Sequence, residues 1–386
     1  MTDRIAALLK AHPVLDGHND LPWALREKAA YDLDALDIAI SQPTLHTDIP
    51  RLRAGGVGAQ FFSVYSPSSM TGSDAVTATL EQIDCVYRII DRYPDTFAFT
   101  RTAADVAEVT AAGRIAALLG AEGGHSIDSS LGTLRMLRKL GVAYMTLTHN
   151  QNTPWADSAT DAPVNNGLND FGREVVREMN RIGMLVDISH VSPDTMRDAL
   201  ATSVAPVIFS HSSCRGLCDH VRDAPDDVLL SLKENDGVIM ITFVPAFVSQ
   251  ECADHRAAGE IERARLGLTP GTVHVEGGST DNPDALAAFA AWEVANPTPV
   301  ATLNQVADHV EYARDLIGAR HLGLGGDYDG VDTLPDGLED VSTYPALIGE
   351  LARRGWSDAD LAGLTSGNIL RVLAKAEEIA DPGFGR

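Results

Sequence analysis

Residues 184–211, MLVDISHVSPDTMRDALATSVAPVIFSH, contain two short apolar runs that each end in Ser-His. The runs, residues 184–188 and 205–209, do not alternate apolar with polar side chains, which predicts strands buried on both faces, as in a parallel sheet. Between them, Ser192-Pro193-Asp194 is typical of a helix start, with serine as the N-cap and proline at the first helical position. This stretch therefore predicts a strand, a helix and a second parallel strand.

Apolar runs of strand length recur along the whole chain, with helical patterns between them. The runs are residues 13–16, 57–65, 115–121, 142–147, 184–188, 205–209, 238–243 and 322–325. Apolar residues at helical spacing occupy residues 75–92, 131–140, 171–182, 194–200, 227–232 and 306–317. Eight strands that alternate with helices predict an α/β fold of the closed (β/α)8 TIM barrel type, and an open doubly wound sheet is the alternative.

Two segments depart from this alternation. Residues 248–300, rich in Ala, Gly, Pro and Glu, are interpreted as an insertion after the seventh predicted strand, and their composition leaves a lid or an oligomer contact open. Residues 357–379 are expected to form a helical tail beyond the last strand. Because 45% of the 386 residues are hydrophobic and no long linker divides them, we expect a single domain over residues 1–386.

The charge balance limits the partners that we expect. With 54 acidic and 30 basic side chains, the formal net charge is −24. Such a surface repels phosphate backbones and anionic lipids, so neither nucleic acid nor membrane is an expected partner. No basic, apolar leader and no run of about 18 apolar residues is visible. The chain has only four cysteines, Cys85, Cys214, Cys218 and Cys252, so we predict a cytoplasmic protein with free thiols.

Polar residues at the strand ends are the candidates for function. His18 and Asp20 follow the first run, Glu122 the third, His149 the fourth, His190 the fifth, His211 the sixth and Asp327 the eighth. The carboxyl ends of barrel strands converge on one rim, where loops from different strands share a pocket. Imidazole and carboxylate suit zinc, and a shared carboxylate holds two ions close together. One such histidine is usually structural, but the recurrence predicts a two-metal centre of His18, Asp20, Glu122, His190 and His211.

The other motifs favour structural roles. The remaining histidines show no such placement: His12, His46, His125, His220, His255, His274, His309 and His321. Cys214 and Cys218 have helical spacing but lie in a predicted loop, which disfavours a thiolate metal site. No phosphate-binding helix pattern follows the glycines at residues 323–326, and no Gly-x-Ser-x-Gly elbow accompanies His211. A nucleotide site and a serine nucleophile are therefore not expected.

As a set, these motifs resemble the membrane (renal) dipeptidase family, a branch of the amidohydrolase-like barrels. The matching segments are LDGHNDLPW (15–23), AEGGHS (121–126), LTHN (147–150), DISHVS (187–192), FSHSS (209–213), DHVRDAPDD (219–227), GGDYDG (325–330) and GNILRVL (367–373). They run in the family's order and cover nearly the whole chain, so the set is specific although each segment alone is weak. Unlike animal members, the chain is expected to lack an export signal and a lipid-anchor tail, and it has no tyrosine in the segment after the seventh predicted strand. Membrane attachment and the animal side-chain preferences are therefore not carried over.

The resemblance implies a dipeptidase with two Zn²⁺ ions per subunit, in a family that often forms homodimers. His18 and Asp20 would hold one zinc, His190 and His211 the other, and Glu122 would bridge both. His149 would contact the scissile carbonyl oxygen, and Asp327 would be the general acid and base. Arg222 would bind the terminal carboxylate of the substrate, with Arg215 as its nearest rival for that role.

The reaction that follows is hydrolysis of L-Xaa-L-Xaa and L-Xaa-D-Xaa dipeptides by a hydroxide that bridges the two ions. A metal-dependent N-acyl amino acid deacylase or a lactonase would keep the same centre, and Arg222 fits an N-acyl amino acid nearly as well as a dipeptide. A barrel that binds a ligand without catalysis is a rival of another class. The filled ligand and general-acid positions disfavour it.

Overall fold

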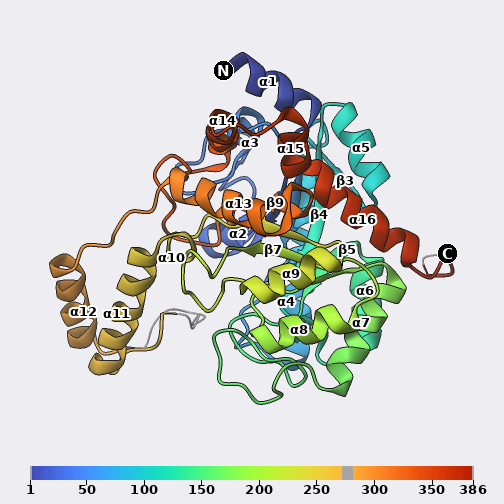
Figure 1. Cartoon of the computed structure of the whole chain (residues 1–386). Coiled ribbons are helices and arrows are strands. Elements are labelled where there is room, and N and C mark those ends of the chain that lie inside the picture. Colours follow the sequence, from blue (N-terminus) through green and yellow to red (C-terminus); the bar gives the residue numbers. More distant parts are fainter. Residues whose placement is uncertain (1, 272–280, 385–386) are drawn as a thin grey trace.

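A computed structural model describes residues 2–271 and 281–384 of the chain. Its strands are β1 (Val14–Asn19), β2 (Val57–Ser63), β3 (Phe97–Phe99), β4 (Ile115–Ala121), β5 (Val142–Thr146), β6 (Leu185–Asp187), β7 (Ile208–Ser212), β8 (Val238–Ile241) and β9 (Leu322–Leu324). They form one parallel sheet in the order β2-β1-β9-β8-β7-β6-β5-β4-β3. β2 also pairs with β4, from Ala59 opposite Ala116 to Ser63 opposite Gly120, so eight strands close into a barrel (Figure 1). The closure confirms the predicted (β/α)8 barrel and excludes the open sheet.

Helices surround the barrel. They include α1 (Thr2–Ala11), α2 (Leu21–Ala29), α3 (Ile49–Ala54), α4 (Gly72–Arg92), α5 (Ala103–Ala111), α6 (Leu131–Lys139), α7 (Asp170–Ile182), α8 (Pro193–Thr202), α9 (Asp226–Glu234), α13 (Leu303–Ile317) and α14 (Tyr344–Arg353). The sequence-based prediction omits α1, α2, α3, α5, α14 and the short strand β3. As predicted, Ser192 caps α8, its hydroxyl accepting a hydrogen bond from the Thr195 amide at 3.2 Å.

Two strands extend further toward their carboxyl ends than predicted. β1 continues to Asn19 and β7 to Ser212, so His18 and His211 lie within strands rather than after them. β7 also begins later than predicted, because Pro206 has no amide hydrogen for the ladder and the Val207 amide bonds instead to the Asn235 side chain. Both histidines therefore take their direction from barrel strands.

The core confirms that the strands are buried on both faces. Every residue of β1, β2 and β4 is buried. Leu15, Phe61, Leu118 and Met240, from four different strands, share one apolar cluster with residues of α16 (Asn368–Ile379). A larger cluster contains the strand residues that pack against the surrounding helices. The barrel is thus a filled core that holds the strand ends rigidly.

The segment after β8 leaves the barrel. It forms α10 (Pro245–Val248), α11 (Gln250–Leu266) and α12 (Pro283–Ala295), and the latter two project together to one side of the barrel (Figure 1). α12 buries none of its residues, whereas Cys252 and Ala253 of α11 are buried. Residues 272–280 of the predicted insertion lie outside the described residues. The predicted tail contains α15 (Asp358–Ala362) and α16. Within residues 2–271 and 281–384, no helix is long and apolar enough to cross a membrane.

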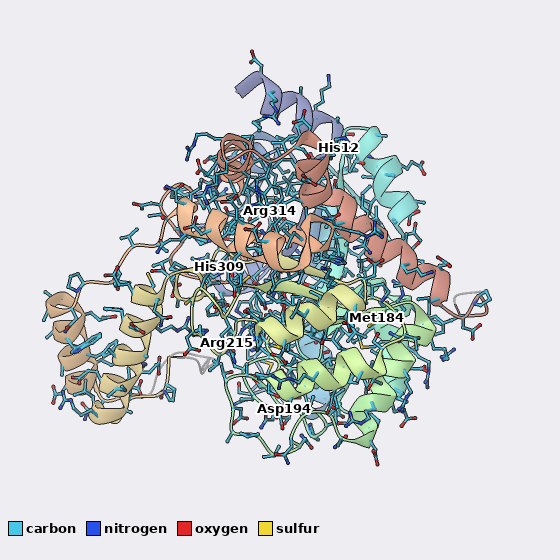
Figure 2. The ribbon with its side chains drawn as sticks, viewed as in Figure 1. His12, Met184, Asp194, Arg215, His309 and Arg314 are labelled. Carbon is cyan, nitrogen blue, oxygen red and sulfur yellow. The ribbon has the colours of Figure 1, made fainter. Side chains whose placement is uncertain are left out.

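His309 of α13 ties the start of this segment to the loop after β7 (Figure 2). Its Nδ1 accepts a hydrogen bond from the Cys214 amide at 3.1 Å, and its Nε2 lies 3.3 Å from the Val248 carbonyl oxygen, to which it donates. Burial lowers the pKa of His309 to about 4, so the ring is neutral at physiological pH. The four cysteines are free and buried, as predicted for free thiols.

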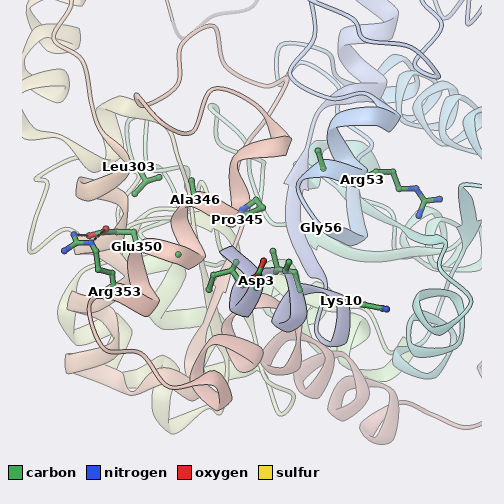
Figure 3. A pocket seen from close by; sticks show the side chains of 14 residues that line it. Asp3, Lys10, Arg53, Gly56, Leu303, Pro345, Ala346, Glu350 and Arg353 are labelled. Atoms are coloured by element: carbon green, nitrogen blue, oxygen red, sulfur yellow. Dashed lines mark hydrogen bonds and ion pairs between the residues drawn. The ribbon is translucent and has the colours of Figure 1, made fainter. Parts of the chain in front are cut away.

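A cavity of about 790 Å³ lies on the outside of the barrel, between α1 and α14 (Figure 3). Leu9 and Ala346 contribute apolar surface, and Lys10, Arg53 and Arg353 contribute charged side chains. None of the predicted site residues is among its lining residues. The cavity is therefore separate from the strand-end rim.

Candidate metal centre

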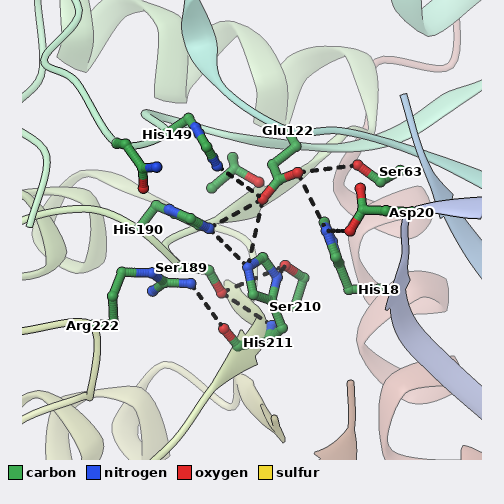
Figure 4. A network of polar contacts seen from close by, with 12 residues as sticks. His18, Asp20, Ser63, Glu122, His149, Ser189, His190, Ser210, His211 and Arg222 are labelled. Atoms are coloured by element: carbon green, nitrogen blue, oxygen red, sulfur yellow. Dashed lines mark hydrogen bonds and ion pairs between the residues drawn. The ribbon is translucent and has the colours of Figure 1, made fainter. Parts of the chain in front are cut away.

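The predicted site residues meet at the carboxyl end of the barrel (Figure 4). His18 lies in β1, Asp20 just after it, Glu122 just after β4, His149 after β5, His190 after β6, His211 in β7, Arg222 in the loop before α9 and Asp327 after β9. All eight are buried. Three overlapping groups have ligand atoms within 4.8 Å of one another: His18, Glu122 and His211; Glu122, His149 and His190; His18, Asp20 and Asp327. The structure thus brings the five proposed ligands together with His149 and Asp327.

Glu122 lies at the middle of the cluster. Its Oε2 is 3.4 Å from His18 Nε2, whereas its Oε1 is 3.1 Å from His190 Nε2 and 3.6 Å from His211 Nε2. The Ser63 hydroxyl donates a hydrogen bond to Oε2 at 3.2 Å. Each carboxylate oxygen therefore faces a different set of imidazoles, which is the arrangement expected of a carboxylate shared by two ions.

The tautomer of His211 follows from its neighbours. The Ser210 hydroxyl donates its one hydrogen to Asp187 Oδ2 at 2.6 Å, and the Thr146 hydroxyl donates to the same oxygen. Ser210 Oγ is also 2.9 Å from His211 Nδ1, so it must accept the Nδ1 hydrogen. His211 Nε2 then carries the lone pair, and this is the atom that faces Glu122 and His190.

A buried tyrosine sets the tautomer of His18 in the same way. The Tyr144 hydroxyl donates to the Gly17 carbonyl at 3.1 Å and lies 2.9 Å from His18 Nδ1, so the Nδ1 hydrogen points to the tyrosine oxygen. His18 Nε2 is thereby left facing Asp20, at 3.3 Å, and Glu122. Gly120 makes this contact possible, since a Cβ atom there would lie 2.0 Å from Cζ of the Tyr144 ring.

His190 and His211 face each other with their Nε2 atoms 2.9 Å apart. Burial lowers the pKa of both imidazoles well below the usual value, and the nearby Arg222 charge lowers it further. Both rings are therefore neutral at physiological pH. Neutral imidazole is the form that binds a metal, and two facing Nε2 atoms can share one cation.

The buried carboxylates also indicate a cation at this site. Burial raises the pKa of Glu122, and it raises the pKa of Asp327 well above the usual range; His18 and Arg222 oppose the shift while Asp20 adds to it. His18 Nε2 and Asp20 Oδ1 are buried without a hydrogen-bond partner among the described residues. An unmet buried polar atom costs about 1–3 kcal/mol. A cation would satisfy both atoms and the excess negative charge, so this mixed nitrogen and oxygen donor set fits a divalent metal such as zinc.

Arg222 lies beside this cluster with its guanidinium buried. Nη1 is 3.4 Å from the Ser212 hydroxyl, Nη2 is 3.3 Å from the His211 carbonyl, and Nε has no partner among the described residues. The ring of Phe247 lies 5.2 Å from the guanidinium carbon. Burial lowers the pKa of Arg222 to about 10, so the group stays charged at neutral pH. A buried cation with unused donors calls for an anionic partner.

Arg215, the other candidate for this role, is committed elsewhere. It donates to the carbonyls of His220, at 3.2 Å, and Val221, at 2.7 Å. Both bonds stay within the loop between β7 and α9. Arg215 therefore stabilises the loop that carries Arg222.

Sequence reasoning missed the residues that orient the candidate ligands. Asp187 and Ser210 lie inside the quoted strand-end motifs, so their proximity to His211 could have been anticipated. Tyr144 lies within a strand, and only the barrel geometry shows that its ring faces His18. Tyr65 was also missed; its ring packs 4.9 Å from that of His149 and 5.0 Å from that of Trp23.

The fold and the site together define a metal-dependent hydrolase: neutral histidines and a central glutamate at the carboxyl ends of the strands of a closed parallel barrel. The family description "Membrane dipeptidase (Peptidase family M19)" matches residues 2–383. The chain belongs to this family and is a metallo-dipeptidase.

Individual relatives agree with the assignment. An uncharacterised dipeptidase of Schizosaccharomyces pombe is 42% identical, over 98% of this chain and 84% of that protein. Dipeptidase 3 of Rattus norvegicus is 39% identical, over 100% of this chain and 70% of that protein. The crystal structure of the probable dipeptidase PvdM from Pseudomonas aeruginosa has the same fold, with a TM-score of 0.84 and 22% identity over 98% of this chain and 99% of that one.

A second solved structure with this fold is a metallopeptidase from Rhodobacter sphaeroides, liganded with a phosphinate mimic of the dipeptide L-Ala-D-Ala. Its TM-score is 0.75, with 22% identity over 94% of this chain and 99% of that chain. At this identity the likeness supports the fold.

Proposed function

We propose that the protein hydrolyses dipeptides of the L-Xaa-L-Xaa and L-Xaa-D-Xaa types with two zinc ions, held by His18 and Asp20 on one side and by His190 and His211 on the other, with Glu122 between them. The observation that carries this proposal is the pairing of Glu122, whose two oxygens face different imidazoles, with the buried guanidinium of Arg222. The phosphinate dipeptide mimic bound by the Rhodobacter enzyme supports the substrate class.

When bound, two zinc ions would supply a Lewis acid for the scissile carbonyl and lower the pKa of a water molecule from about 15.7 to about 7. His149 contributes a hydrogen-bond donor beside the carbonyl oxygen. Burial lowers the pKa of His149 well below the usual value, so the ring is neutral and one nitrogen carries a hydrogen. A donor aimed at a developing oxyanion contributes about 3 kcal/mol to catalysis.

Asp327 is the general acid and base of the proposed reaction. Burial raises the pKa of Asp327 well above its usual value, which makes this carboxylate a stronger base for a proton than an exposed one. It takes the proton of the attacking water and passes it to the leaving amine, which is a poor leaving group until it is protonated.

Arg222 selects short substrates. Its planar fork matches a carboxylate in bidentate fashion. A carboxylate bound here lies at the end of the substrate, so the peptide cannot continue beyond the residue after the scissile bond. The same contact would accept an N-acyl amino acid, so a deacylase activity is the second candidate function.

The first test compares the zinc-loaded protein on matched dipeptides, N-acetyl amino acids and carboxyl-amidated dipeptides. We expect the free-carboxylate dipeptides to be the best substrates, and Arg222→Met to raise their KM more than tenfold with little change for the amides. Arg222→Lys, which keeps the charge but loses the fork, should lie between. A faster reaction with N-acetyl substrates would favour the deacylase. An equal rise in KM for free-carboxylate and amidated dipeptides in Arg222→Met would show that Arg222 does not bind the terminal carboxylate.

A further inference from the structure

The loop between β5 and α7, residues 147–169, packs against the loop that carries His190. Ser158 and Val191 form an antiparallel bridge between the two loops. The Ala159 amide donates to the His190 carbonyl at 2.8 Å, and the Ser192 amide donates to the Asp157 carbonyl at 2.9 Å. Two segments far apart in the sequence thus act as one support for the rim of the site.

Within this support, the Ser158 hydroxyl lies between the main chains of two site histidines. It donates to the His149 carbonyl at 2.6 Å and lies 3.3 Å from the His190 carbonyl. Ser158 is buried, so water does not compete for these contacts. A hydroxyl has a single hydrogen, and the shorter distance assigns most of that bond to His149.

The two carbonyls do not depend equally on Ser158. His190 adopts a left-handed backbone conformation, with φ of 65°, which is unfavourable for any residue with a Cβ and needs support from its surroundings. Its carbonyl has that support from the Ala159 amide and from the Thr148 hydroxyl at 3.2 Å. Loss of the Ser158 hydroxyl therefore affects His149 first.

The imidazole of His149 has less support than those of His18 and His211. Tyr144 and Ser210 fix the Nδ1 atoms of His18 and His211, whereas His149 Nδ1 is buried without a hydrogen-bond partner among the described residues. The position of this ring is therefore set by its main chain and by packing, including the contact with Tyr65. The main-chain anchor is the bond from Ser158.

We propose that Ser158 is a positioning residue that holds His149 at the distance from Glu122 and His190 that the reaction requires. The His149 Nε2 atom is 3.7 Å from the same Glu122 oxygen that His190 Nε2 approaches to 3.1 Å, and the two ring centroids are 4.4 Å apart. The inference rests on the proposed function, in which His149 contacts the scissile carbonyl oxygen. A shift of about 1 Å in such a group can slow a reaction by about 100-fold.

The test replaces Ser158 by alanine and measures dipeptide hydrolysis, zinc affinity and thermal unfolding. We expect kcat to fall at least tenfold, with KM within about twofold and zinc affinity within about threefold of the wild type, because His149 is not one of the proposed ligands. Ser158→Thr, which retains the hydroxyl, should recover most of the rate. A wild-type kcat in Ser158→Ala would overturn the proposal.

Thr148→Val is the matched variant, since it removes a hydroxyl whose one hydrogen bond among the described residues is to the His190 carbonyl. We expect it to weaken zinc binding, measured by competition with a chelator, about tenfold. If Ser158→Ala weakens zinc binding by as much, Ser158 supports the metal ligands rather than His149, and the proposal is wrong.

A readout without turnover separates this inference from the proposed function. In protein labelled with 15N-histidine, Ser158→Ala should shift the imidazole signals of His149 and leave those of His18 and His211 in place. If the wild type hydrolyses no dipeptide, the proposed function fails, and the His149 signals still decide the positioning role. An unmoved His149 signal would contradict it.

Discussion

At the scale of single residues, buried hydroxyls determine which imidazole nitrogens face the centre. The Ser210 hydroxyl donates its hydrogen bond to Asp187 and so accepts one from His211 Nδ1. The Tyr144 hydroxyl donates to the Gly17 carbonyl and so accepts one from His18 Nδ1. His211 and His18 therefore present Nε2 to the cluster before any ion binds. This preorganisation removes the cost of turning the rings when a metal arrives.

Replacing Ser210 by alanine tests this preorganisation. The variant leaves His211 free to place its hydrogen on Nε2, and we expect zinc affinity to fall about 10- to 100-fold. Competition with a chelator measures the change, and Tyr144→Phe should have a similar effect through His18. Ser126→Ala is the control, because this serine is also buried and, within residues 2–271 and 281–384, its hydroxyl contacts only the Met145 sulfur, at 4.0 Å. Unchanged zinc affinity in Ser210→Ala would show that the tautomer is not set by this serine.

At the scale of elements, the sequence predicts the strands that form continuous apolar runs and misses the strand β3. The strands were visible as apolar runs because both faces of β1, β2 and β4 are buried. β3 is as short as β6 and β9, but its apolar run, Phe97–Phe99, is flanked by threonines, and two of its three residues are only partly buried. The inward position of Tyr144 depends on barrel closure and on the space that Gly120 leaves, which no local pattern records. The candidate ligands could be predicted because they lie at the carboxyl ends of strands, whereas the position of Tyr144 beside His18 could not.

The helix α5 was missed although its start carries a local signal. In Thr102-Ala-Ala-Asp105, the Asp105 amide donates to the Thr102 hydroxyl and the Thr102 amide donates to the Asp105 carboxylate, both at 3.0 Å. This capping box satisfies two amides that the first turn of the helix leaves unpaired. A threonine followed three residues later by an aspartate, just before a run of helix-forming residues, is a local signal for this helix start.

Thr102→Ala removes the hydroxyl from this cap. We expect the free energy of unfolding to fall by about 1 kcal/mol, as for other N-cap threonines, with zinc affinity unchanged because α5 carries none of the candidate ligands. Chemical denaturation at fixed free zinc measures the effect. Thr102→Ser keeps the hydroxyl and should restore most of the stability. A loss in Thr102→Ser as large as in Thr102→Ala would place the cause in the threonine methyl group.

At the scale of the whole molecule, burial keeps four interior histidines neutral, although the chain as a whole carries a formal net charge of −24. Burial lowers the pKa of His149, His190, His211 and His309. These rings remain neutral in the folded protein at a pH where the unfolded chain takes up protons. Acid therefore favours unfolding, and the effect begins near the ordinary pKa of histidine.

His309 allows this effect to be measured away from the metal centre. Its folded pKa of about 4 lies below the ordinary value of 6.5, so its contribution to stability is complete above pH 6.5 and is lost as the pH falls from 6.5 to 4. The full loss is about 3 kcal/mol, at about 1.36 kcal/mol per pH unit. We expect His309→Asn, which keeps an acceptor for the Cys214 amide, to be less stable than the wild type at pH 7 and to lose less stability between pH 6.5 and 4.5.

The measurement is the slope of unfolding free energy against pH, taken as the difference between variant and wild type at fixed free zinc, so that proton uptake at the metal centre cancels. His309→Asn should flatten the slope by up to one proton. His12 follows α1 and is exposed (Figure 2), so His12→Asn should leave the slope unchanged. If both variants keep the wild-type slope, the acid sensitivity of the fold originates elsewhere, with the histidines of the metal centre as the remaining source.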